Sequence, residues 1–230
     1  MILSGLQKMT LLDFPGRIAC TVFTGGCDFR CPFCHNSSLV ESKGGFPVFP
    51  TEDFFDFLSK RAGMLDGVAI TGGEPTIQAG LMPFMERIKA LGLLVKLDTN
   101  GNHPDVLAEI LKNGLCDYVA MDVKSSRERY GAAVGIEGFD TSKVERSVDM
   151  LISGNTDFEF RTTVVKGIHT LEDMESVGRW IAGDEKYFIQ KFKSSGDILR
   201  EGMDAHDDGT MEEMLKIVLP FVPKAQLRGM

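Results

Sequence analysis

Short runs of apolar residues alternate along the chain with longer stretches that are apolar on one helical face only. This alternation is typical of βα units, in which buried parallel strands are covered by amphipathic helices. The pattern predicts six strands, near Ile18–Thr24, Gly67–Thr71, Leu93–Asp98, Asp117–Asp122, Asp157–Val165 and Tyr187–Gln190. It predicts six helices, near Glu52–Arg61, Ala79–Ala90, Asp105–Lys112, Lys143–Ile152, Leu171–Ile181 and Met211–Leu219.

Several helix starts are marked by residues that can cap the first turn. A hydroxyl residue followed three positions later by a carboxylate forms a capping box, and proline suits the first helical position. The predicted signals are Ser142 with Glu145, Thr170 with Asp173, Thr210 with Glu213, and Pro104.

The number of βα units limits the architecture. Six units in about 190 residues are too few for an eight-fold barrel, which leaves an open six-unit barrel or a doubly wound sheet. Residues 194–209 are polar and lack a clear period, so we expect a loop or lid there. We expect one domain over residues 1–230, with a lead-in over 1–17, a barrel core over 18–190, and a loop and C-terminal helix over 191–230.

Charge and hydropathy exclude two classes of function. Lys and Arg number 25 against 33 Asp and Glu, a net charge of −8. That balance argues against a nucleic-acid-binding protein, which needs a basic face. We find neither a signal peptide nor the roughly 18 consecutive apolar residues of a membrane helix, so we expect a cytoplasmic protein with no membrane partner.

Three cysteines lie within eight residues directly after the first predicted strand. They are Cys27, Cys31 and Cys34, followed by His35, on a loop that opens with two glycines. Thiolates at this spacing can surround one compact inorganic centre. In a four-iron cluster, three local thiolates would leave one iron open for a substrate.

Three other interpretations of this loop stay open on spacing alone. Cys27, Cys31, Cys34 and His35 could form a structural zinc site, Cys31–His35 matches the attachment motif of a c-type haem, and Cys31 with Cys34 could be a redox pair. The haem motif leaves Cys27 unexplained. The remaining cysteines, Cys20 and Cys116, are best interpreted as small buried hydrophobic residues.

Polar and glycine residues gather where the predicted strands end, and the carboxyl ends of strands carry the functional groups in βα folds. Each cluster alone would more often be an ordinary turn or an ion pair. Together they offer acceptors for an amino group, donors for a carboxylate, and acidic groups for ribose hydroxyls or a cation. They are Gly72-Gly73-Glu74-Pro75, Asp98-Thr99-Asn100-Gly101, Asp122-Val123-Lys124 and, within the fifth strand, Arg161.

These motifs resemble those of radical S-adenosylmethionine enzymes, in particular the activases of glycyl-radical enzymes. The cysteine spacing, with Phe33 before the last cysteine, and the Gly-Gly-Glu-Pro segment carry the resemblance. The N-terminal segment from Gly5 to Gly16 is similar to the activating proteins of anaerobic ribonucleoside-triphosphate reductase. The resemblance extends to about Gln190 and implies an α/β fold, the incomplete (β/α)6 barrel of the radical S-adenosylmethionine type.

The resemblance also implies a [4Fe–4S] cluster on Cys27, Cys31 and Cys34, with S-adenosylmethionine chelating its open iron. The implied cofactor-binding residues are Phe33, His35, Gly72, Gly73, Glu74, Asp98, Asn100, Asp122, Val123, Lys124 and Arg161. Phe33 and the backbone of His35 would lie against the adenine, and Glu74 would meet the amino group. Asp98, Thr99 and Asp122 resemble a monovalent-cation site.

Two segments depart from the family pattern. The fifth strand continues into Val164-Val165-Lys166-Gly167-Ile168, which lacks a Gly-x-Ile-x-Gly motif, so adenine contacts there are undefined. A late-barrel histidine found in some activases has no clear match, and Gln190 occupies that region. No cysteine-rich insertion for auxiliary clusters is present.

The function implied is an oxidoreductase that cleaves S-adenosylmethionine to a 5′-deoxyadenosyl radical. The radical would install a glycyl radical on anaerobic ribonucleoside-triphosphate reductase, with flavodoxin or ferredoxin as electron donor. Alternatives are pyruvate formate-lyase or another glycyl-radical enzyme as the partner, and a small molecule as the substrate. From a different class, the alternative is a zinc-stabilised binding protein.

Overall fold

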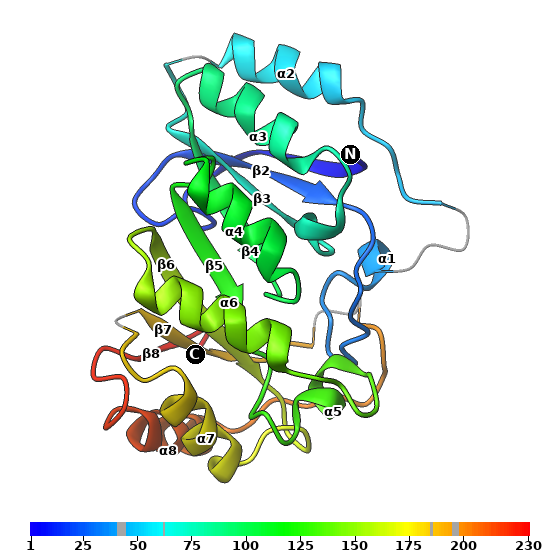
Figure 1. Cartoon of the computed structure of the whole chain (residues 1–230). Coiled ribbons are helices and arrows are strands. Elements are labelled where there is room, and N and C mark those ends of the chain that lie inside the picture. The colour runs from blue at the N-terminus through cyan, green and yellow to red at the C-terminus, as the bar shows by residue number, and fades with distance from the viewer. Residues whose placement is uncertain (41–44, 62, 185, 195–197) are drawn as a thin grey trace. The chain divides into compact units, whose positions relative to one another are not determined.

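The computed structural model describes residues 1–40, 45–61, 63–184, 186–194 and 198–230 (Figure 1). The chain divides into two compact units, each assembled from separate segments. Unit 1 comprises residues 1–28, 38–99 and 105–120, and unit 2 comprises residues 29–37, 100–104 and 121–230. The expectation of a single domain over 1–230 stays a prediction.

Unit 1 is built on parallel strands that carry one antiparallel strand at the edge. Strand β1 (Leu3–Thr10) pairs antiparallel with β2 (Ala19–Thr24), and β2, β3 (Gly67–Gly72) and β4 (Leu94–Thr99) are parallel neighbours. Its helices are α1 (Ser37–Val40), α2 (Thr51–Lys60), α3 (Leu81–Ala90) and α4 (Pro104–Lys112), with a 3₁₀ turn, η1 (Pro75–Ile77). The ends of α1 and α4 cross the unit boundary.

Apolar side chains at helical spacing hold α2 and α3 together in unit 1. Phe54 and Phe84 stack with ring centroids 5.2 Å apart, and Phe55 meets Phe84 edge-on. Figure 1 shows the two helices side by side. On the polar side of the two helices, Arg87 donates two hydrogen bonds to Glu52. Each helix therefore has a buried apolar face and an exposed polar face.

Unit 2 contains the remaining strands and helices. Strand β5 (Tyr118–Asp122) begins in unit 1 and ends in unit 2, where β6 (Asp157–Val164), β7 (Tyr187–Lys191) and β8 (Gln226–Arg228) are parallel neighbours. Its helices are α5 (Tyr130–Val134), α6 (Ser142–Ser153), α7 (Leu171–Trp180) and α8 (Asp208–Val218). Helices α7 and α8 pack against each other, as Figure 1 shows.

All six predicted strands and all six predicted helices are present, as β2–β7 and as α2–α4 and α6–α8. The structure adds β1, β8, η1 and the short helices α1 and α5. These were missed because they are brief or, in β1, mix polar and apolar residues on an edge strand. Part of the expected 194–209 loop, residues 195–197, lies outside the described residues; within the rest, α8 already begins at Asp208.

Two of the three predicted capping boxes are wrong. Thr170 and Asp173 do cap α7 reciprocally, as predicted. Ser142, however, is the first residue of α6, and its N–H donates to Asp140. Thr210 lies within α8, where its N–H donates to the true N-cap, Asp207. In both cases an aspartate upstream was the better acceptor.

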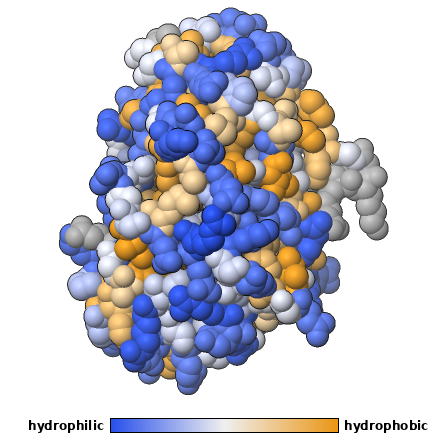
Figure 2. All heavy atoms as spheres, in the orientation of Figure 1, coloured by the Kyte–Doolittle hydropathy of each residue, from blue (hydrophilic) through white to orange (hydrophobic). Residues whose placement is uncertain are grey.

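Within the described part of the chain, no helix has the length and apolarity needed to cross a bilayer. Figure 2 shows hydrophilic residues over most of the visible face, with hydrophobic ones in scattered patches. The helices thus turn their charged faces outward, as their amphipathic patterns predict.

Candidate active site

The cysteine loop follows β2 and is divided between the two units. Cys27 belongs to unit 1, whereas Cys31 and Cys34 belong to unit 2. Cys31 is buried, and the N–H of Cys34 donates to its carbonyl oxygen at 3.0 Å, which closes a turn that carries both thiols. Cys27 and Cys34 are half-buried.

Main-chain hydrogen bonds tie the second half of this loop to distant segments of unit 2. The N–H of Arg30 donates to the carbonyl of Val134 in α5 at 2.9 Å, and the N–H of Arg200 donates to the carbonyl of Pro32 at 3.0 Å. A Cβ at Gly135, at the end of α5, would lie 2.2 Å from the carbonyl oxygen of Arg30. Glycine is therefore needed there for α5 to support the cysteine loop.

Burial keeps the Cys31 thiol protonated when no metal is bound. It raises the pKa of Cys31 to about 11, although the Lys124 ammonium acts in the opposite direction. Because metal ligation requires the thiolate, the metal must supply the free energy that removes this proton.

The glycine pair after β3 has a steric reason within unit 1. Gly72 has φ +115°, and a Cβ on it would lie 2.3 Å from the backbone nitrogen of Thr24. A Cβ on Gly73 would lie 2.0 Å from the carbonyl oxygen of Gly26. The Gly73 and Glu74 N–H groups donate to Thr24 and Gly26, so this turn packs directly on the first residues of the cysteine loop.

Glu74 is a buried anchor of the same turn. Its side chain caps η1, and Oε1 accepts hydrogen bonds from the Thr76 N–H at 3.0 Å, the Thr76 hydroxyl at 2.5 Å and the Thr99 hydroxyl at 2.8 Å. The residue is 1% exposed. This structural role was not predicted, and recognition of an amino group by Glu74 stays a prediction.

We expect Glu74→Ala to destabilise the protein by about 3 kcal/mol, because it leaves a buried N–H and two buried hydroxyls without this acceptor. Glu74→Gln is the matched control, since its amide oxygen can still accept all three bonds. Urea unfolding of both variants measures the difference. Equal destabilisation by alanine and glutamine would show that the carboxylate charge, not the acceptor geometry, matters.

The Asp98–Asn100 segment is also engaged by its own neighbours. Asp98 forms an ion pair with Lys96, which is 2% exposed. Thr99 donates to Glu74, and the Asn100 side chain accepts from the Asn102 N–H at 2.9 Å in an Asx turn. The ordinary-turn interpretation of Asn100 is therefore confirmed, while its cofactor role stays a prediction.

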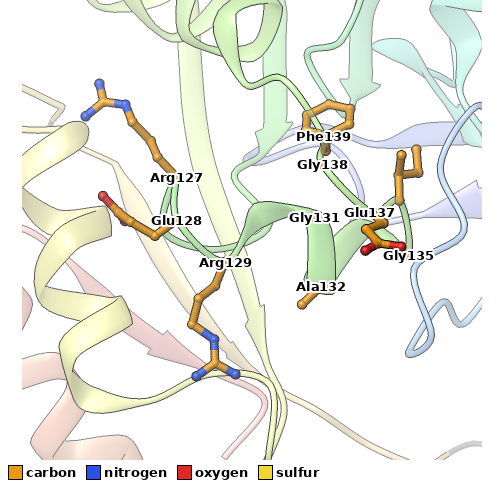
Figure 3. A pocket seen from close by; sticks show the side chains of 10 residues that line it. Arg127, Glu128, Arg129, Gly131, Ala132, Gly135, Glu137, Gly138 and Phe139 are labelled. Carbon is orange, nitrogen blue, oxygen red and sulfur yellow. The ribbon is translucent and has the colours of Figure 1, made fainter.

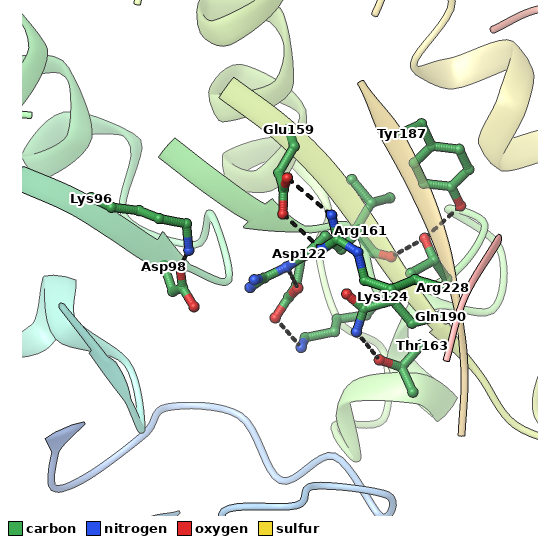
Figure 4. Close-up of polar contacts among 12 residues, drawn as sticks. Lys96, Asp98, Asp122, Lys124, Glu159, Arg161, Thr163, Tyr187, Gln190 and Arg228 are labelled. Atoms are coloured by element: carbon green, nitrogen blue, oxygen red, sulfur yellow. Dashed lines mark hydrogen bonds and ion pairs between the residues drawn. The ribbon is translucent and has the colours of Figure 1, made fainter. Parts of the chain in front are cut away.

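A charged network occupies the end of β5 in unit 2 (Figure 4). Asp122 lies between two cations: Lys124 Nζ is 2.9 Å from Oδ2, and Arg161 Nε is 2.9 Å from Oδ1. All three side chains are mostly buried. Between them, Val123 is fully buried, donates its N–H to the Arg161 carbonyl and accepts from the Thr162 hydroxyl.

The charges of this network stabilise each other. Burial alone would raise the pKa of Asp122, but Arg161 and Lys124 outweigh burial and hold that pKa well below its usual value. Burial likewise would lower the pKa of Lys124, but Asp122 and the Cys31 sulfur raise it above its usual value. At neutral pH the site therefore presents an ion triad with two positive charges and one negative.

His169 joins this network to the cysteine loop and was not singled out from the sequence. Its Nδ1 accepts from the Val165 N–H at 3.0 Å, so Nε2 carries the proton that is donated to the Lys124 carbonyl at 2.7 Å. Burial lowers the pKa of His169, which keeps the imidazole neutral. The ring meets Phe33 edge-on, with centroids 5.8 Å apart. Only the tertiary contacts identify His169, because one histidine after a strand carries no pattern.

A hollow of about 500 Å³ lies beside α5 (Figure 3). Arg127, Arg129, Glu128, Glu137 and Phe139 contribute to its lining. Arg127 pairs with Glu145 and Arg129 with Asp173, so both arginines are held by acidic partners. None of the predicted site residues lines this hollow.

The sequence comparisons identify a family. The profile of the Radical SAM superfamily matches residues 21–181. A Methanocaldococcus jannaschii protein, provisionally named as a glycyl-radical enzyme activating enzyme, is 34% identical over 224 residues, covering 95% of this chain and 86% of its own. The pyruvate formate-lyase-activating enzyme of Clostridium pasteurianum is 27% identical, over 93% of this chain and 96% of its own.

A comparison of structures agrees on the fold. A domain of the pyruvate-formate lyase-activating enzyme from Bacteroides vulgatus superposes with a TM-score of 0.58 at 15% identity, covering 71% of this chain and 99% of that one. The predicted fold class is confirmed as α/β with mostly parallel strands, of the incomplete (β/α)6 barrel type.

Proposed function

Because the chain belongs to the radical S-adenosylmethionine superfamily, we propose that it activates a glycyl-radical enzyme, specifically anaerobic ribonucleoside-triphosphate reductase. It is an enzyme of the radical S-adenosylmethionine oxidoreductase type. The observation that carries the activase assignment is the 34% identity to the M. jannaschii relative over nearly the whole chain. The reductase as partner is supported by the N-terminal segment alone.

The donor set fits the cofactors that the family implies. Cysteine thiolates are the usual ligands of four-iron clusters, and Cys27, Cys31 and Cys34 supply three. A cluster held by these three thiolates would supply one-electron reduction of S-adenosylmethionine, which yields methionine and the 5′-deoxyadenosyl radical that the activation of a glycine residue requires. Membership of this family explains the cysteine spacing, so the zinc site, the haem attachment and the redox pair are not needed to explain the loop.

The surrounding residues have defined tasks in this proposal. Lys124 and Arg161 are cations that can receive the methionyl carboxylate, and Asp122 holds both in position. His169 fixes the Lys124 carbonyl and packs against Phe33, which is assigned to the adenine together with the backbone of His35. The amino group of S-adenosylmethionine is assigned to Gly72, Gly73 and Glu74. The remaining residues proposed to bind the cofactor are Asp98, Asn100 and Val123.

A monovalent cation on Asp98, Thr99 and Asp122 remains part of the proposal with less support. Lys96 already neutralises Asp98, and Lys124 and Arg161 already neutralise Asp122. A bound cation would have to compete with these groups.

The turn that follows β1 exposes two leucines at the end of β2 opposite to the cysteine loop, because Thr10 pairs with Ala19 whereas Thr24 precedes that loop. Leu12 is 90% exposed and Leu11 66% exposed. They project from a turn in which the Thr10 hydroxyl oxygen accepts from the N–H groups of Leu12 and Asp13. Single exposed apolar residues are common on protein surfaces, so this turn serves as a control position.

Spin-resonance spectroscopy tests the partner. The reduced enzyme, S-adenosylmethionine and the reductase of the same organism are mixed without oxygen, with flavodoxin or ferredoxin compared as electron donors. We expect a doublet protein-radical signal that disappears when the reductase's radical-site glycine is replaced by alanine. The double variant Leu11→Ser/Leu12→Ser, at the opposite end of β2 from the cysteine loop, is the control and should leave this signal unchanged.

Other outcomes select the alternatives. A radical on pyruvate formate-lyase, but not on the reductase, would change the partner and keep the activase assignment. Cleavage with no radical on either protein would favour a small-molecule substrate. A colourless protein holding one zinc would replace the proposal with a zinc-stabilised binding protein.

A further inference from the structure

A second hollow, of about 310 Å³, lies in unit 2 where β6, β7 and β8 end. Carboxyl ends of parallel strands are where βα folds bind ligands. The hollow is lined by three cations and by polar groups, and its described lining contains no carboxylate. Its lining includes His35, Thr163, Gln190, Lys191, Lys193 and Arg228.

Three of the lining residues form a row of polar side chains across three neighbouring strands. The sheet register places Thr163 beside Gln190 and Gln190 beside Arg228. Figure 4 shows these side chains together, with Gln190 Nε2 3.5 Å from the Thr163 hydroxyl. The row presents an amide N–H group, a hydroxyl and a guanidinium to the same space.

Arg228 is held in place before any ligand arrives. Its two terminal nitrogens lie 3.1 and 3.4 Å from the carboxylate oxygens of Glu159, which is 2% exposed. The guanidinium also lies 3.6 Å above the Phe188 ring centroid. Since a guanidinium has five N–H groups, this pairing leaves donors for a second acceptor.

The rim of the hollow is fixed to the cysteine loop. His35 Nε2 donates to the Lys193 carbonyl at 2.7 Å, and the His35 ring stacks on Phe192 with centroids 5.1 Å apart. Lys191 forms an ion pair with Asp208. Counted over the described residues, three cations against two paired carboxylates, Glu159 and Asp208, leave one net positive charge in a chain whose overall charge is −8.

We propose that this hollow binds an anionic group, a carboxylate or a phosphate, between Lys193, Arg228 and the Gln190 amide. The ligand's charge would match the net positive charge counted over the described residues, and neutral donors would complete its hydrogen bonds. The anion would lie beside His35, the residue that follows Cys34. This binding is independent of the activase assignment, because it requires neither cofactor cleavage nor a protein partner.

Calorimetric titration of the iron-reconstituted protein at low ionic strength tests the site, with inorganic phosphate and succinate as separate probes. We expect saturable binding of at least one probe at one site. Lys193→Ala should weaken it about ten-fold, the effect of a lost charged hydrogen bond. Thr163→Val leaves the charge of the hollow unchanged and should weaken probe binding less than Lys193→Ala does. The matched control is Lys143→Ala, which replaces an exposed lysine on α6.

The relative affinity of the two probes identifies the source of the anion, a phosphate or a carboxylate, and either result supports the site. The proposal is overturned if neither probe binds saturably. It is also overturned if Lys193→Ala and Lys143→Ala bind alike. The titration is repeated with saturating S-adenosylmethionine. If S-adenosylmethionine competes with the probe, the hollow belongs to the cofactor pocket, and the proposal of a separate site is overturned.

Discussion

Replacing Cys27, Cys31 or Cys34 singly by alanine is expected to abolish reductive cleavage of S-adenosylmethionine. Each thiolate would hold one iron, and no spare thiol lies on the loop to replace it. Reconstituted wild-type protein should contain about four irons per chain and be brown. Iron analysis, absorption spectra and 5′-deoxyadenosine formation under anaerobic conditions measure these effects.

Cys20→Ala and Cys116→Ala are the matched controls for the cysteine variants. Cys20 is fully buried in β2, and Cys116 donates to the Tyr118 carbonyl at 3.0 Å. Burial raises the pKa of each thiol to about 12, as expected for cysteines that pack as apolar residues. Their replacement should cost about 1 kcal/mol of stability and leave the iron content unchanged. Loss of iron in either variant would contradict the proposed ligand set.

Asp122→Asn is expected to produce the second largest effect, on stability and on cofactor binding together. The change removes the carboxylate that lies between Lys124 and Arg161 and leaves two mostly buried cations without their common partner. Breaking a buried ion pair in this way costs about 3 kcal/mol. Because both cations lose their orientation, we also expect at least about ten-fold weaker binding of S-adenosylmethionine.

The pH dependence distinguishes this charge effect from a packing defect. The pKa of Asp122 is lower in the folded chain, so the ionised carboxylate stabilises the fold above its unfolded pKa of about 4. That stabilisation is lost as the pH falls below this value toward the folded pKa. The difference in unfolding free energy between wild type and Asp122→Asn should therefore be constant near pH 7 and shrink below about pH 4. A difference that does not change with pH would show that Asp122 acts through packing alone.

The sequence by itself determined the βα order and the chemical character of the loop after β2. Periodicity is a local property, so the six strands and six helices followed from the apolar positions alone. The cysteine spacing and the Gly-Gly-Glu-Pro segment were sufficient to identify the superfamily, because such motifs depend on residue type and order. The added strands β1 and β8 could not be predicted, since a short or mixed strand is defined by its neighbour in the sheet.

Only the tertiary structure decided what individual side chains do. The sequence predicts Glu74 as a ligand for an amino group, and the structure adds a second role, since its burial beside Thr76 and Thr99 makes it an anchor of its own turn. His169 had no motif, and its role depends on a carbonyl 45 residues away in the chain. The cationic hollow arises because the parallel register aligns Thr163, Gln190 and Arg228 across three strands. Long-range register and burial set these contacts, and neither is encoded in the spacing of nearby residues.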